Sequence, residues 1–177
     1  MGDMHAPIEI PLTYEQLLEG GYPGLIRWAM ACVERRKSIR PLGPNNQSAV
    51  EGDVLGAVAE RAVHIWADEP WKMGGLAEFL ARPRGDPPRD VRDWEVRATW
   101  RWDGHLILRP KDQKYANLPF IFCTMEATPI VRIRGWAWGR DVMVDELWNK
   151  DSWWMPQKML RPCPDKPKPK GDEGCAK

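Results

Sequence analysis

The sequence predicts an α/β (α+β) fold in a single domain, and three features support this prediction. Residues 94–102 and 129–139 alternate in side-chain character with the period of a β-strand. Residues 49–66 repeat apolar side chains at helical spacing. The chain has 177 residues, of which 43% are hydrophobic, and this is enough for one core. We therefore expect a sheet flanked by helices.

Two helical regions are expected in the first part of the chain. Residues 1–12 should form an extended lead-in, and residues 13–16, Thr-Tyr-Glu-Gln, have the form of a capping box that begins a helix. The Gly-Gly-Tyr-Pro-Gly segment at 20–24 should interrupt this helix, because glycine and proline break regular structure. A second capping box precedes a helix that should run from about Ala49 to about Trp66.

The strands are expected after a proline- and glycine-rich connection at 67–89. Asp103-Gly104 is a strong signal for a two-residue turn, so residues 94–102 and 105–109 should pair as an antiparallel hairpin. In that register Trp100 would lie opposite Ile107.

Two more strands are expected at 119–127 and 129–139. The domain should span residues 13–161. Residues 162–177 are rich in proline and lysine and should form a disordered tail without core residues.

The residues with the clearest chemistry lie on the first predicted strand. Glu95 and Arg97 are two positions apart and share one face of the strand, and Asp90 precedes them. Carboxylates are hard oxygen ligands for Mg²⁺, and a cation beside them can contact a phosphate. These residues fit a metal-dependent phosphodiesterase. The alternative is an exposed strand face on which the charges pair with one another.

Two glutamates stand out in the helix predicted at 49–66. On a helical wheel Glu51 falls inside the apolar stripe, whereas Glu60 falls nearly opposite, beside Asp53 and His64. A buried carboxylate needs a partner such as a metal ion or an arginine. Two interpretations of Glu51 remain open: it has such a partner, or it only completes the helix cap.

Several arginines are candidates for contacts with nucleic acid. Arg132 and Arg134 share a predicted strand face with two tryptophans, which suits a nucleic-acid surface, although the same residues can pack as cation–π pairs. The basic end of the first helical region either holds phosphates or is a solvated face. The phosphate-contacting candidates are Arg35, Arg36, Arg101, Arg132 and Arg134.

Composition excludes several classes of protein. The net charge is +1, so a nucleic-acid surface must come from local segregation of the 26 lysines and arginines. The four cysteines and three histidines show no zinc spacing, so neither structural zinc nor a disulfide framework is expected. The first ten residues lack the basic-then-apolar pattern of a signal peptide, and no apolar run is long enough to span a bilayer. We expect a protein of the reducing cytoplasm without a membrane partner.

A series of short motifs runs from about residue 48 to about residue 162. In order they are Glu51-Gly52, Asp90-Val91, Trp94-Glu95-Val96-Arg97, Leu106-Ile107-Leu108-Arg109-Pro110 with Asp112, Gly135-Trp136, Gly139-Arg140-Asp141, Trp154-Met155-Pro156 and Leu160-Arg161-Pro162. In this order and spacing they resemble small phage-encoded proteins with a PD-(D/E)XK nuclease-like fold, which are distantly similar to the mismatch-repair nicking endonuclease.

The resemblance implies a restriction-endonuclease-like core, with a mixed sheet of four to five strands flanked by helices and the site at one end of the sheet. It implies that Asp90 and Glu95 bind Mg²⁺ or Mn²⁺ and that Glu51 helps to hold the metal or its water. Arg97 stands where most such nucleases have lysine. Arginine can stabilise charge but cannot deprotonate a water molecule.

A second departure from the family lies in the early helix. The family often has a further glutamate in the middle of this helix, and the match places Gly56 there. Glu60 is the nearest substitute, although its position on the helical wheel argues against it.

Three hypotheses follow. The first is an Mg²⁺-dependent endonuclease that cuts DNA, with Arg97 on the scissile phosphate, in the host cytoplasm if the protein is phage-encoded. The second is a catalytically inactive nucleic-acid-binding or host-interaction protein on the same scaffold. The third is a partner-binding protein with a tryptophan-rich interface. A homodimer is a candidate assembly.

Overall fold

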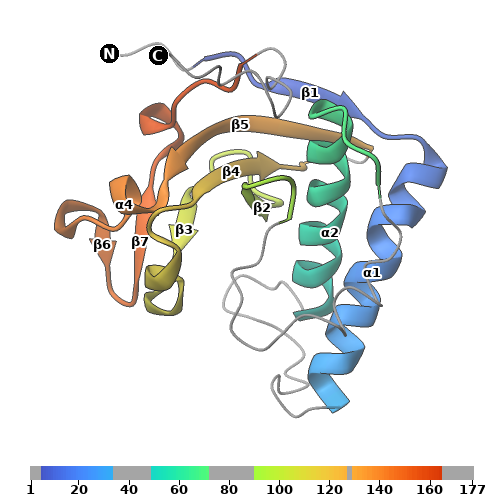
Figure 1. Cartoon of the computed structure of the whole chain (residues 1–177), viewed down its shortest axis with the longest axis horizontal. Helices are drawn as coiled ribbons and strands as arrows, with labels where there is room; N and C mark the ends of the chain where they lie inside the picture. Colours follow the sequence, from blue (N-terminus) through green and yellow to red (C-terminus); the bar gives the residue numbers. More distant parts are fainter. Residues whose placement is uncertain (1–4, 34–48, 72–89, 127–128, 165–177) are drawn as a thin grey trace, which may run out of the picture.

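The computed structural model describes residues 5–33, 49–71, 90–126 and 129–164, and Figure 1 shows the arrangement of their elements. In chain order these are β1 (Ile8–Pro11), α1 (Tyr14–Val33), α2 (Ala49–Trp66), β2 (Glu95–Thr99), β3 (Leu106–Leu108), η1 (Pro110–Tyr115), β4 (Pro119–Thr124), β5 (Ile130–Trp138), α4 (Gly139–Val142), η2 (Asp145–Leu147), β6 (Trp148–Asn149), β7 (Ser152–Met155) and η3 (Gln157–Met159).

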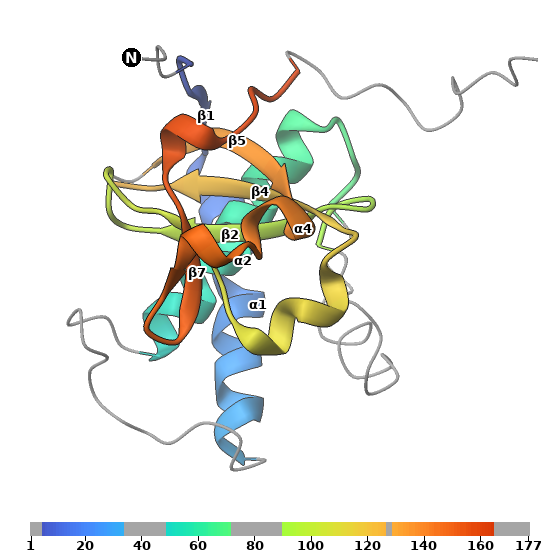
Figure 2. The same ribbon diagram turned by 90° about the vertical axis from the view of Figure 1, so that its left-hand side faces the viewer.

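The strands form two sheets. A mixed four-stranded sheet has the order β1-β5-β4-β2, in which β2 and β4 are parallel and the other pairs antiparallel. A smaller antiparallel sheet has the order β3-β7-β6. Helices α1 and α2 lie on one side of the four-stranded sheet, and β7 and α4 lie on the other (Figures 1 and 2). The predicted α/β class, with a mixed four-stranded sheet flanked by helices, is confirmed.

Helix α1 begins at the predicted cap. The backbone N–H of Thr13 donates to Oε1 of Gln16 at 2.8 Å, and the N–H of Gln16 donates to Oγ1 of Thr13 at 3.2 Å. These reciprocal bonds satisfy donors that the first turn leaves without helical partners. The interruption predicted at 20–24 is wrong, because α1 continues through this segment to Val33.

The glycines of this segment serve contact between helices. A Cβ added at Gly24 would lie 2.5 Å from the carbonyl oxygen of Asp53, and one at Gly20 would lie 2.8 Å from Cα of Val58. Both Asp53 and Val58 belong to α2. The two glycines therefore let the backbones of α1 and α2 approach more closely than any side chain would allow.

Helix α2 spans Ala49–Trp66, as predicted. It packs against α1 and also against strands of the four-stranded sheet. Its buried residues consequently run around much of the helix, and they include Leu55, Ala57, Val58, Ala59, Glu60, Ala62 and Val63. The prediction of a single apolar stripe on this helix is wrong for that reason.

The predicted hairpin is also wrong. Strand β2 pairs in parallel with β4, with Glu95 opposite Phe120, and β3 pairs with β7, with Leu106 opposite Met155. A turn does form before β3, one residue earlier than predicted, because the N–H of Gly104 donates to the carbonyl of Arg101 at 3.1 Å and leaves Trp102 and Asp103 at its centre. It carries the chain from one sheet to the other instead of folding β3 back onto β2.

A bulge at Gly135 changes the predicted faces of β5. The register with β4 shifts here, and Gly135 has a φ of +144°, a conformation that favours glycine. Trp136 consequently packs against the same cluster as Val131 and Ile133. The prediction that Arg132, Arg134 and Trp136 share one face is therefore wrong.

Hydrophobic side chains cover both faces of the four-stranded sheet. From β4, Ile121 and Cys123 pack in the cluster beneath the helices, whereas Phe120 and Phe122 pack toward the smaller sheet.

Part of the segment predicted as a disordered tail contacts the core. Cys163 packs against the first cluster, and the carbonyl of Pro162 accepts a bond from the Trp136 indole at 3.1 Å. Residues 165–177 lie outside the described residues. No helix in the described part of the chain is long and apolar enough to cross a membrane.

Candidate functional site

A cavity of about 600 Å³ lies where α1, α2, β2 and η1 meet, at the edge of the four-stranded sheet formed by β2. We call it the carboxylate cavity. Its acidic lining residues are Asp53, Glu60, Asp90, Glu95 and Asp112, and its basic lining residues are Arg27, Arg97, Lys111 and Lys114.

The structure brings together three of the predicted site residues and replaces a fourth. Asp90, Glu95 and Arg97 all line the carboxylate cavity. Glu51 is exposed and does not line it, whereas Glu60 is only 7% exposed and does. Glu60, about two and a half turns further along α2 than Glu51 at about 3.6 residues per turn, is thus the helix acid of this cavity. The prediction placed the helix acid at Glu51, and the structure does not bring Glu51 to the other carboxylates.

Asp90 is held at the start of β2 by backbone contacts. Its Oδ2 accepts a bond from the N–H of Val96 at 2.8 Å, and its own N–H donates to the carbonyl of Trp94 at 3.1 Å. Nε2 of His64, from α2, lies 3.1 Å from the carbonyl oxygen of Asp90. These contacts fix the Asp90 carboxylate beside the first residue of the strand, Glu95.

Glu95 is the most buried carboxylate of the cavity, with 2% of its surface exposed. Its Oε1 accepts a bond from Arg97, which also donates to Oδ1 of Asp112 at 3.3 Å and lies over the Phe120 ring at 5.4 Å. Among the described residues, the buried Oε2 of Glu95 has no hydrogen-bond donor. A buried anionic oxygen without a donor is costly, so this atom points to a missing cation or proton.

Arg27 supplies a counter-charge from α1. Its guanidinium donates to both carboxylate oxygens of Glu60, at 2.5 and 2.6 Å. Two parallel bonds of this kind are the strong form of an arginine–carboxylate contact. Glu60 is thereby compensated within the protein, whereas one oxygen of Glu95 is not.

Crowding and burial change the ionisation of two acids. Burial raises the pKa of Glu95 to about 7, and the charges of Glu60 and Asp112 add to this against the opposing effect of Arg97. The pKa of Asp90 is raised well above its ordinary value, first by burial and then by the negative charges of Glu60 and Glu95. Acids whose ionised forms are disfavoured in this way are typical of sites that take a cation or handle a proton.

No protein-family model, curated protein or solved structure matches this chain. The interpretation of the cavity therefore depends on its own geometry.

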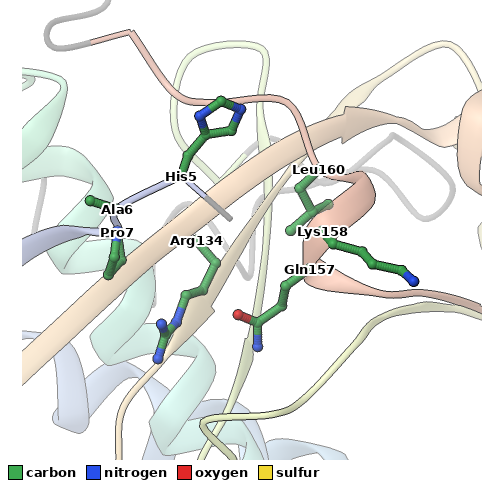
Figure 3. A pocket seen from close by; sticks show the side chains of 7 residues that line it. All are labelled: His5, Ala6, Pro7, Arg134, Gln157, Lys158 and Leu160. Carbon is green, nitrogen blue, oxygen red and sulfur yellow. The ribbon is translucent and has the colours of Figure 1, made fainter. Parts of the chain in front are cut away.

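Arg132 and Arg134, two of the predicted phosphate contacts, do not line the carboxylate cavity. Arg132 pairs with Glu9 and Glu126, and Arg134 pairs with Glu126 at 2.5 Å. Arg134 lines a separate, smaller cavity of about 170 Å³ (Figure 3). Because carboxylates already neutralise both arginines, they are poorly placed to hold a backbone phosphate.

Three further arginines were predicted to contact phosphate: Arg101, Arg35 and Arg36. Arg101 is exposed and pairs with Asp103 through two contacts of 3.0 Å. Arg35 and Arg36 lie outside the described residues.

Five charged lining residues were not among the predicted site residues: Arg27, Asp53, Lys111, Asp112 and Lys114. In the sequence, Asp112 belongs to a motif without an assigned role, and Arg27 is one of several basic residues in the first helical region. Lys111 carried no signal of its own. The residues around Asp112 in the sequence do not predict that η1 packs against β2. This contact forms only in the tertiary structure.

Proposed function

We propose that this protein is an Mg²⁺- or Mn²⁺-dependent endonuclease of the PD-(D/E)XK type that hydrolyses phosphodiester bonds in DNA. The observation that carries the proposal is the buried Oε2 of Glu95, which lacks a donor among the described residues and lies in a cavity shared with Asp90. We further propose that α2 and the sheet β1-β5-β4-β2 are a restriction-endonuclease-like core. The parallel pairing of β2 with β4 beneath a helix that carries an acid supports this assignment.

The chemistry of the donor set fits a hard divalent cation. In the described part of the chain, no three Asp, Glu, His or Cys side chains are arranged to hold a metal ion by themselves. Mg²⁺, however, usually keeps several waters and needs only one or two carboxylates together with substrate phosphate. Asp90 and Glu95 would supply these carboxylates. When bound, the ion would lower the pKa of a water molecule and offset negative charge on the phosphate.

The other residues of the cavity have separate tasks. Arg97 stays protonated at any ordinary pH, so it would stabilise charge on the scissile phosphate and would not accept a proton. Lys111 and Lys114 are exposed at the cavity and would attract the nucleic-acid backbone. Arg27 would hold Glu60 in place beside Asp90, since both oxygens of Glu60 are engaged.

A plasmid-nicking assay with Mg²⁺ or Mn²⁺ tests the proposal. Glu95→Gln and Asp90→Asn should lower the cleavage rate by a factor of roughly 100 or more, because they remove a ligand charge while keeping the side-chain volume. Glu51→Gln is the matched control, since Glu51 lies on the same helix as Glu60 but outside the cavity. Equal cleavage by wild type and Glu95→Gln, or loss of cleavage in Glu51→Gln, would contradict the proposal.

A second candidate function is a catalytically inactive nucleic-acid-binding protein on the same scaffold. One observation favours it: Arg97 bonds to both Glu95 and Asp112, so a side chain already partly occupies the place of a cation. If this second function is the correct one, the protein should bind DNA without a divalent ion, and its affinity should fall steeply as the salt concentration rises. Absence of nicking together with such binding would select this function.

A further inference from the structure

A second cavity, of about 540 Å³, adjoins the carboxylate cavity and shares Arg97, Ala98, Lys111 and Asp112 with it. We call it the basic cavity. It extends from these shared residues past Arg101 and Arg109 to Trp154, which belongs to β7 of the smaller sheet. The two cavities therefore connect the acidic residues at the edge of one sheet with an aromatic side chain of the other.

The charge of the basic cavity is positive. Its two carboxylates are already engaged: Asp103 pairs with Arg101, and Asp112 accepts bonds from Arg97 and from the N–H of Arg109 at 2.9 Å. Arg109 and Lys111 are exposed, and within the described ranges neither forms an ion pair. Two cations in an open cavity, without a carboxylate partner in that part of the chain, are suited to phosphate oxygens.

The far end of the basic cavity is aromatic. Trp154 is 37% exposed, and its indole N–H donates to Oγ of Ser152 at 2.8 Å, which fixes the ring. The ring of His105 lies 5.9 Å from it, tilted by 52°. An anchored, partly exposed indole is a platform on which a nucleic-acid base can stack with little sequence preference.

We propose that the basic cavity binds a single-stranded segment of nucleic acid next to the bond that enters the carboxylate cavity. Phosphates of this segment contact Arg109 and Lys111, and a base stacks on Trp154. A base inside a duplex is already stacked on its neighbours and cannot reach the indole. A volume of this size holds a drug-sized ligand, which corresponds to roughly one or two nucleotides and not to a duplex. The inference rests on the proposed nucleic-acid function of the neighbouring site and specifies its substrate as one with an unpaired strand.

Fluorescence anisotropy of a short labelled strand, in the presence of chelator, tests binding apart from cleavage. Wild type should bind the single strand more tightly than a blunt duplex of the same sequence. Trp154→Ala should weaken binding of the single strand roughly tenfold, and Trp154→Phe should restore most of it. Arg109→Ala/Lys111→Ala should weaken binding by a similar factor and reduce its salt dependence.

Matched controls are available on the same molecule. Trp148 is 44% exposed and lines neither cavity, so Trp148→Ala should bind as wild type does. The exposed residues Arg140 and Lys150 also line neither cavity, so their double alanine variant controls for the loss of two positive charges. A parallel series with RNA strands distinguishes the two sources of a phosphate-and-base ligand.

The outcomes separate this inference from the proposed function. Preferred binding of the duplex, or unchanged single-strand binding in Trp154→Ala, would overturn the inference even if the protein nicks plasmid DNA. Conversely, a protein that nicks nothing but loses single-strand binding in Trp154→Ala would retain the inference and lose the nuclease proposal. Circular dichroism of each variant confirms that a loss of binding does not reflect unfolding.

Discussion

Arg27 in α1 donates to both carboxylate oxygens of Glu60 in α2, at 2.5 and 2.6 Å. The side chain of Glu60 is 9% exposed and that of Arg27 is 26% exposed, so the pair lies mostly out of water. Removal of one partner of a buried pair leaves the other charge without compensation. This pair therefore links the packing of the two helices to the wall of the carboxylate cavity.

Loss of this pair should destabilise the protein. We expect Arg27→Met to lower the free energy of unfolding by about 3 kcal/mol, as measured by urea denaturation. The double variant Arg27→Met/Glu60→Met should recover part of the loss, because no charge is left unpaired. Arg101→Met is a control, since Arg101 also forms a two-contact pair but is exposed, and it should change stability little. Equal effects of Arg27→Met and Arg101→Met would contradict the structure.

The raised pKa of Glu95 predicts how stability depends on pH. The folded state raises this pKa from 4.5 to about 7, so between these values the folded protein holds a proton that the unfolded chain has released. The free energy of unfolding should therefore fall as pH rises through this range, by at most about 3 kcal/mol. Asp90 shifts in the same direction.

The comparison of Glu95→Gln with wild type isolates this effect. Glutamine cannot ionise, so the variant should lose less stability than wild type between about pH 5 and about pH 8 in urea denaturation. Glu51→Gln, which removes an exposed carboxylate outside the carboxylate cavity, is the matched control for the loss of one acid. A Glu95→Gln profile parallel to that of wild type would show that Glu95 titrates normally.

Divalent cations should stabilise the protein where the two carboxylates are ionised. We expect Mg²⁺ or Mn²⁺ to raise the melting temperature measurably at about pH 8 and less at about pH 5, because protons compete with the ion. The ion-dependent shift should disappear in Asp90→Asn and in Glu95→Gln but persist in Glu51→Gln. Differential scanning fluorimetry with and without chelator measures this shift. An unchanged shift in Asp90→Asn would place the ion elsewhere.

The close contact of α1 with α2 predicts opposite effects of two alanine substitutions on one helix. Gly24→Ala should destabilise the fold by about 2 kcal/mol, because its Cβ would meet backbone atoms of α2. A Cβ at Gly21 would be 3.9 Å from Cγ1 of Val54, an ordinary contact. Gly21→Ala should therefore stabilise the protein by up to about 1 kcal/mol, through helix propensity. Thermal unfolding of both variants checks the pair.

Local sequence signals predicted local structure well. The cap of α1 at Thr13 and the span of α2 depend on neighbouring residues, and both predictions are confirmed. A turn also forms next to the Asp103-Gly104 signal, one residue earlier than predicted, over residues 101–104. The signal could not show which strand β2 pairs with, because β4 begins twenty residues after β2 ends and the pairing depends on contacts between distant segments.

The candidate site could be predicted only where its residues are neighbours in the sequence. Asp90, Glu95 and Arg97 lie within one short segment and were found together. The helical wheel argues against Glu60 because it assumes one buried face, whereas α2 is buried against both a helix and a sheet. Arg27 could not be assigned at all, since its role arises from packing between α1 and α2.

The close contact of α1 with α2 at Gly20 and Gly24 also holds the guanidinium of Arg27 against Glu60. A shortened chain that begins after α1 would retain Asp90 and Glu95 but would lose the guanidinium that Glu60 now binds. The carboxylates of Glu60, Asp90 and Glu95 would then repel one another in the carboxylate cavity. We expect such a fragment to depend on bound ions for its folding and to unfold on chelation, whereas the intact polypeptide carries its own internal cation.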